Sequence, residues 1–329
     1  MDRSALVNFI LAQPADTEPK NWLKTNEISN ARDFGTYVGI FRNAAEHTDQ
    51  LERQITFRLR MLWALRQRPE TFVDALKEMA TISDLLDRLP ESPRKNALTA
   101  DFAGNGAIVE RAYGRYAMAA RLQMTAEKAW HQAQELAPDD LAIRTSCFIA
   151  KFCAKVEILA VAVTVNETDV MEFDMLLKAA KETETNLADT PAGQAWLICN
   201  IPWHRLEGHL LTNDEYDELD NDLERLMAIG EPSHPFHKGY GVFAKVAKAF
   251  ALVKENQTDP GLALARQVIA EDEYGDTTCA AYLIIAASHY NNDNANEMVE
   301  TLNQMVRHPS RGGNKFRAAA LQLLATMDK

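Results

Sequence analysis

The chain has 329 residues, of which 47% are hydrophobic and 25% are charged, and it contains only 14 Gly and 12 Pro. These proportions are those of an ordinary globular protein; they exclude a collagen-like or disulfide-rich chain and disfavour a turn-rich all-β fold. The formal net charge of −12 disfavours nucleic acid and membrane surfaces as partners, because such a field repels phosphate groups at long range.

The N-terminal region and the cysteines predict a cytoplasmic protein. A short apolar stretch over residues 4–12 is followed by no cleavage site, so we expect a first helix and not a signal peptide. The four cysteines lie 6, 46 and 80 residues apart, which fits neither a zinc-binding pair nor a compact disulfide framework. The most apolar segment, 141–165, carries charged residues inside it and is expected to be a buried helix, not a membrane span.

Helical periodicity recurs along the chain and predicts an all-α fold of about 13 helices joined by short connections. Apolar residues fall at helical spacing over 51–62, 216–226 and 236–250, for example. Candidate helix starts are Ser92-Pro93, Thr190-Pro191, Thr212-x-x-Glu215, Asp259-Pro260 and Asn294-x-x-Glu297. Gly230 and Pro309 are candidate stops. Helices of this length with short connections favour antiparallel neighbours.

Residues 107–140 carry the pattern of one helical repeat. Its small, aromatic and proline positions are Gly114, Ala126, Trp130, Ala133 and Pro138. The segment resembles the 34-residue tetratricopeptide repeat. The resemblance implies a right-handed α-solenoid of stacked helical hairpins, in which small residues allow close helix approach and the proline ends the second helix. A shift of the pattern by 34 residues retains only Ala160, so the remaining hairpins are expected to be degenerate.

Thr190-Pro191 interrupts the helical pattern and predicts a boundary between N-terminal hairpins, residues 1–190, and C-terminal hairpins, residues 191–329. A second candidate boundary lies near residues 230–235. Neither a Ser/Gly-rich nor a Pro-rich segment is long enough to separate two mobile domains, so the two parts are expected to pack continuously. The glycines of 104–106 lack the rest of a dinucleotide-binding fingerprint and are interpreted as a turn between two helices.

Two groups of charged residues are candidates for partner binding. Arg58 and Arg66 lie within the apolar stripe of one helix; they would pair with carboxylates of a neighbouring helix or contact an anion or an acidic peptide. Asp214, Asp217 and Glu218 belong to a run of seven acidic residues on the outer face of a helix. This run would serve solubility or dock a basic segment of a partner.

His204, Glu207 and His209 are the candidate metal ligands, since two imidazoles and a carboxylate can hold a divalent ion. Their spacing argues against a site. The histidines are five residues apart, or about 140° around a helix, whereas zinc-binding helices place them four apart on one face. We therefore expect no metal and no other cofactor.

The favoured function is that of a non-enzymatic adaptor or scaffold that binds a protein or peptide segment in a groove between stacked hairpins. Members of the tetratricopeptide family commonly act as interaction scaffolds, and the resemblance implies Arg111, Arg115 and Gln123 as groove-facing residues of the recognisable hairpin. One alternative is an all-α enzyme that uses a metal or a small ligand at the candidate metal ligands. Another is a regulatory protein that senses a ligand or a peptide. The sequence does not indicate the oligomeric state.

Overall fold

The computed structural model describes residues 34–66, 71–161, 167–168, 170–173, 175–176, 178–179, 205–211, 219–230, 240–271, 275–308 and 315–327. These residues form an all-helical fold that contains no strand within the described ranges, as the sequence predicts. No described helix is both long and apolar enough to cross a lipid bilayer.

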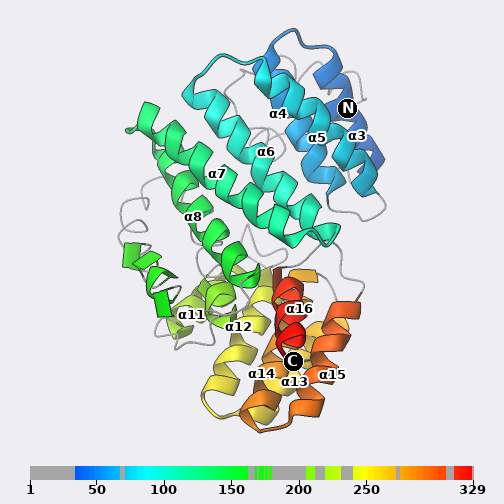
Figure 1. Ribbon diagram of the computed structural model, residues 1–329, viewed down its shortest axis with the longest axis vertical. Coiled ribbons are helices and arrows are strands. Elements are labelled where there is room, and N and C mark those ends of the chain that lie inside the picture. Colours follow the sequence, from blue (N-terminus) through cyan, green and yellow to red (C-terminus); the bar gives the residue numbers. More distant parts are fainter. Residues whose placement is uncertain are drawn as a thin grey trace.

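The helices form two groups. The N-terminal group is α3 (Phe34–Glu46), α4 (Leu51–Leu65), α5 (Phe72–Asp87), α6 (Pro93–Ala112), α7 (Tyr116–Leu136) and α8 (Leu141–Val161). The C-terminal group is α11 (Leu219–Gly230), α12 (Tyr240–Lys254), α13 (Thr258–Glu271), α14 (Gly275–Asn291), α15 (Ala295–Arg307) and α16 (Lys315–Met327). Figure 1 shows α3, α4 and α5 packed together and α6, α7 and α8 side by side, with the second group below them and α16 near the end of α8.

Consecutive helices pack against each other, and some helices also contact the second helix along the chain. Such contacts join α4 to α6, α12 to α14 and α14 to α16. A helix that contacts both the next helix and the one after it forms a triangle with them, so such helices lie in two layers. The contact between α8 and α16 joins the two groups, so helices far apart in the sequence lie side by side (Figure 1).

Three hairpins reverse direction through the same turn. Its central residue is left-handed, with φ angles of 72° at Gly114, 62° at Asn256 and 57° at Asp293. The N–H of the following residue donates to a carbonyl five residues earlier over 2.8 to 2.9 Å: Arg115 to Glu110, Gln257 to Leu252 and Asn294 to His289. This bond is that of the Schellman motif. In all three hairpins, the second helix begins two residues after the left-handed residue.

The second helices of these hairpins also share a register. The ninth and twelfth residues after the left-handed residue are buried in each: Gln123 and Ala126 in α7, Ala265 and Val268 in α13, Leu302 and Met305 in α15. From Asn256 to Asp293, the α12–α13 and α14–α15 hairpins repeat after 37 residues. Equivalent positions hold different residues, so a sequence comparison does not show this repeat.

The hairpin expected within 107–140 has other boundaries. Because Gly114 occupies the turn, α6 forms the first helix and α7 the second, and the pair spans 93–136. Trp130 packs beside the alanine cluster that joins these two helices, and α7 ends two residues before Pro138.

The turn expected at 104–106 is wrong, since these residues lie inside α6. Gly106 is buried where α6 meets α5 and α7. A Cβ atom there would lie 2.7 Å from Met79 and 3.3 Å from Leu122, so glycine serves a close approach between helices and not a change of direction.

The predicted helix limits are mostly close to the observed ones. Ser92 caps α6, because its Oγ accepts the Lys95 N–H at 3.0 Å, and Pro93 is the first helical residue. Gly230 ends α11, while α13 begins at Thr258, one residue before Asp259. The candidate starts at Thr190 and Thr212, and the predicted domain boundary, lie outside the described residues.

Each group has its own apolar core. The N-terminal core includes Ile55, Phe57, Leu62 and Ile82, and the C-terminal core includes Leu226, Val246, Ala265, Ile284 and Phe316. The helical segment 205–211 contacts two apolar clusters. Leu206 and Leu210 belong to the C-terminal core, and Leu211 packs against the cluster around Phe152 of α8 and Phe173. This short segment therefore helps to join the two groups.

We predict opposite effects for two glycine-to-alanine substitutions. In Gly208→Ala the new Cβ would overlap the Phe173 ring, which is 1% exposed and cannot move freely, so unfolding should become easier by about 1–3 kcal/mol. In Gly104→Ala the Cβ meets nothing within 4 Å, and the helix should gain about 0.5–1 kcal/mol. Urea unfolding monitored by circular dichroism measures both; a neutral Gly208→Ala would contradict this packing.

Candidate functional site

A cleft of about 390 Å³ opens between α13, α14 and α15. Its lining residues are Arg266 and Ile269 from α13, Tyr282, Ile285 and His289 from α14, and Glu297, Glu300, Thr301 and Gln304 from α15. On each helix they recur at spacings of three or four residues, with Glu300 and Thr301 adjacent on α15, so each helix turns one face toward the cleft. The volume lies at the small end of the range of about 300–1,000 Å³ found for ligand pockets.

The floor of the cleft is apolar. Ile285 is buried, and Ile269 and Tyr282 are half-buried. The ring of Tyr282 also packs against the ring of His308, with 5.7 Å between the ring centroids, which limits its motion. An apolar side chain from a ligand would be dehydrated on this floor.

The walls of the cleft are charged. Glu297 and Glu300 are exposed on α15, and Arg266 is exposed on α13. The side-chain amide of Gln304 donates to Glu300 Oε1 at 3.3 Å and orients this carboxylate. The Thr301 hydroxyl is used within the helix, because it donates to the Glu297 carbonyl at 2.7 Å.

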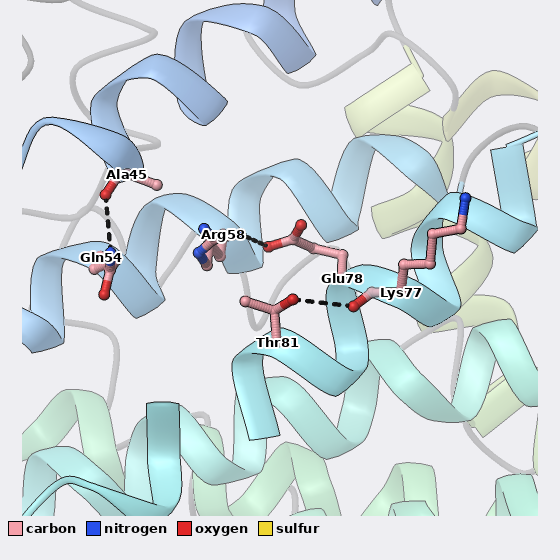
Figure 2. A network of polar contacts seen from close by, with 6 residues as sticks. All are labelled: Ala45, Gln54, Arg58, Lys77, Glu78 and Thr81. Atoms are coloured by element: carbon pink, nitrogen blue, oxygen red, sulfur yellow. Dashed lines mark hydrogen bonds and ion pairs between the residues drawn. The ribbon is translucent and has the colours of Figure 1, made fainter. Parts of the chain in front are cut away.

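Arg58 pairs with a neighbouring helix, which is one of the two alternatives that the sequence leaves open. Figure 2 shows Arg58 of α4 reaching Glu78 of α5, with 2.8 Å between Nη1 and Oε1. Both side chains are largely buried, at 17% and 11% exposure. Gln54 fixes α4 to α3 in the same region by donating to the Ala45 carbonyl at 3.1 Å (Figure 2).

Arg66, the other arginine of this stripe, is the C-terminal cap of α4. Its backbone N–H donates to the Leu62 carbonyl at 3.0 Å, and the residue is half-buried. Neither arginine is placed next to the cleft on α13 to α15.

Of the residues expected to face a groove, the structure places Arg111 and Gln123 in the interior and Arg115 at the turn of the hairpin. Arg111 is buried at the end of α6, where its Nη1 lies 2.6 Å from Glu157 Oε1 of α8. Gln123 is buried in α7, in the second helix of the hairpin. Arg115 is half-exposed, and its Nη2 donates to Glu110 Oε1 at 3.0 Å, which connects the two sides of the turn.

The candidate metal ligands are only partly described. His204 lies outside the described residues, as do Asp214, Asp217 and Glu218 of the acidic run. Glu207 and His209 are both buried, and the His209 ring packs edge-on against Phe173 at 5.5 Å. Within the described parts of the chain, no group of three or more His, Cys, Asp or Glu side chains is placed to hold a metal ion.

Comparison of the chain with protein-family models, with curated proteins and with solved structures finds no match.

Sequence reasoning missed the cleft, although a signal is present. Glu297 is interpreted from the sequence as part of a capping box with Asn294, but the Asn294 side chain makes no capping hydrogen bond. The polar residues Glu297, Glu300 and Gln304 form a stripe at helical spacing on α15. Tyr282, Ile285 and His289 form a second stripe on α14, but nothing in the sequence shows that the two stripes face each other.

Burial of Glu78 predicts a pH-dependent stability. Burial raises the pKa of this carboxyl, and the opposing hydrogen bond from Arg58 does not cancel the effect. The contribution of Glu78 to the free energy of unfolding is therefore fully present below the unfolded pKa of about 4.3, and it is lost as the pH rises through the folded pKa. In urea unfolding from about pH 4 to 7, the free energy of the wild type should fall relative to that of Glu78→Gln. A difference that is constant with pH would contradict this assignment.

For the buried Arg111–Glu157 pair, we predict that the effects of two substitutions on the free energy of unfolding are strongly non-additive. Glu157→Leu leaves the Arg111 cation buried without its carboxylate and should cost about 3–5 kcal/mol, while Arg111→Met with Glu157→Leu should recover most of the loss. The exposed Lys77–Asp74 pair is the matched control, and its cycle should give a coupling below about 1 kcal/mol. Denaturant-unfolding double-mutant cycles measure both couplings; equal values would refute the special role of the buried pair.

Proposed function

We propose that the protein is a non-enzymatic helical-repeat scaffold that binds a segment of a partner protein in the cleft between α13, α14 and α15. The observation that carries the proposal is the position of this cleft. It lies between two consecutive hairpins, α12–α13 and α14–α15, and it combines an apolar floor with charged walls. Such a surface binds through apolar burial and selects its ligand through charge.

We further propose that the hairpins stack as a right-handed tetratricopeptide-like solenoid. Three features support the stacking. The same left-handed turn closes three hairpins, their second helices share a buried register, and α12, α14 and α16 contact one another in sequence. In a stack of this kind each hairpin contacts mainly its neighbours, and grooves arise between hairpins.

A reducing, cytoplasmic location fits this function. The described cysteines, Cys147, Cys153 and Cys279, hold thiols and not disulfides. Burial also raises the pKa of the Cys147 thiol, which keeps it protonated and unreactive. Disulfides persist in oxidising compartments, so thiols of this kind support a cytoplasmic protein.

A sensor of a small ligand is the second candidate function, since the volume of the cleft also suits a small molecule. The charged walls on opposite helices favour the scaffold, because a protein segment can reach both walls at once.

Filling the cleft should abolish partner binding. In Gln304→Trp an indole ring would occupy the space above the apolar floor without removing a core residue or a charge. Affinity enrichment from a lysate of the source organism should retain a specific protein on the wild type and lose it on Gln304→Trp. Gln132→Trp is the matched control, because Gln132 is an exposed glutamine on α7.

The same enrichment is run with and without a chelator. A partner that is lost on the cleft variant, kept on the control and indifferent to chelation supports the scaffold. A partner that both variants retain would remove the cleft from the binding site, and retention that depends on metal would favour an enzyme.

A further inference from the structure

We infer that the segment held by the cleft presents one lysine or arginine to Glu297 and Glu300 and an adjacent apolar side chain to Tyr282 and Ile285. The inference rests on the proposed function and specifies the chemistry of its partner. It follows from the distribution of charge around the cleft, from the apolar floor and from the charge of the whole chain.

The carboxylates of α15 are placed to receive a cation. Glu297 and Glu300 are three residues apart on one face of α15, which brings their side chains about 5–6 Å apart at Cβ. Among the described residues, neither carboxylate is paired with a lysine or an arginine, and Gln304 holds one oxygen of Glu300 in place. A lysine ammonium or an arginine guanidinium between them can bind both.

The opposite wall limits how many basic side chains fit. Arg266 of α13 is exposed at the cleft and would repel a second cation beside it. A polybasic segment is therefore disfavoured, whereas a single basic residue next to an apolar one suits both walls and floor. An acidic peptide or a nucleic acid would place like charge against Glu297 and Glu300.

The electrostatic field of the whole chain also favours a basic segment. A net charge of −12 attracts a basic segment at long range and raises its association rate, while the two carboxylates of the cleft fix where it binds. The long-range field and the local site are separable by experiment, because they depend on different residues.

Selection from a random peptide library displayed on phage tests the inference. Three forms of the full chain serve as targets: the wild type, a cleft variant Glu297→Gln with Glu300→Gln, and a control variant Glu91→Gln with Glu135→Gln. Both variants lose two exposed carboxylates and thus have the same net charge. The glutamines preserve the size of the side chains, and circular dichroism verifies that all three forms are folded.

The wild type and the control should both enrich peptides with one Lys or Arg next to an aliphatic or aromatic residue, and the cleft variant should not. Fluorescence anisotropy of a selected peptide should show an affinity roughly three- to thirtyfold lower for the cleft variant than for the control, the effect of losing two exposed ion pairs. The peptide should also fail to bind Gln304→Trp.

The outcomes separate the two proposals. Some selected peptides could lose binding to Gln304→Trp, which shows that they need the cleft, and yet show no preference for Lys or Arg or bind the double glutamine variant equally well. Such peptides would overturn the inference and leave the scaffold function standing. An equal loss of affinity on the cleft variant and the control also overturns it, since the whole-chain field would then explain the preference. Failure to enrich any peptide that is sensitive to Gln304→Trp would contradict the scaffold function itself.

Discussion

The left-handed turn that closes three of the hairpins constrains how their helices pack. A left-handed residue followed by the six-to-one hydrogen bond fixes the direction in which the second helix leaves the first. Because Gly114, Asn256 and Asp293 occupy equivalent positions, the second helices α7, α13 and α15 bury residues at the same offsets from the turn. Helices as short as α13 and α15 are marginal alone, so their stability comes from the packing that the turns enforce.

Polar contacts lie near the place where the two groups of helices meet. Arg111 of α6 pairs with Glu157 of α8, and α8 in turn contacts α16. On α16, Arg317 donates to the His308 carbonyl and is hydrogen-bonded to Tyr116, the first residue of α7. Burial raises the pKa of Tyr116, which keeps its hydroxyl neutral and able to donate. Polar groups of this kind tolerate few alternative arrangements, because each loses its partner if the helices shift.

The sequence predicts the elements of this fold better than it predicts their arrangement. Helical periodicity and the Ser92 cap depend on neighbours in the chain, and both are found in the structure. The repeat is hidden because a left-handed turn accepts Gly, Asn or Asp, and because buried positions accept Gln, Ala or Leu. Arg111 has the polarity of a surface residue, yet it is buried, since Glu157 of another helix neutralises it. That partnership depends on tertiary packing and leaves no pattern in the sequence.

The residues that line the cleft have two different roles in the structure. In the C-terminal group, α13 and α15 each pack against α14, which lies between them and forms the floor of the cleft. The residues of the floor belong to the packing of the hairpins, whereas Arg266, Glu297 and Glu300 are exposed on the walls. Under the proposed function, changes on the walls would alter the partner without weakening the core, so the fold would be kept while the specificity changes.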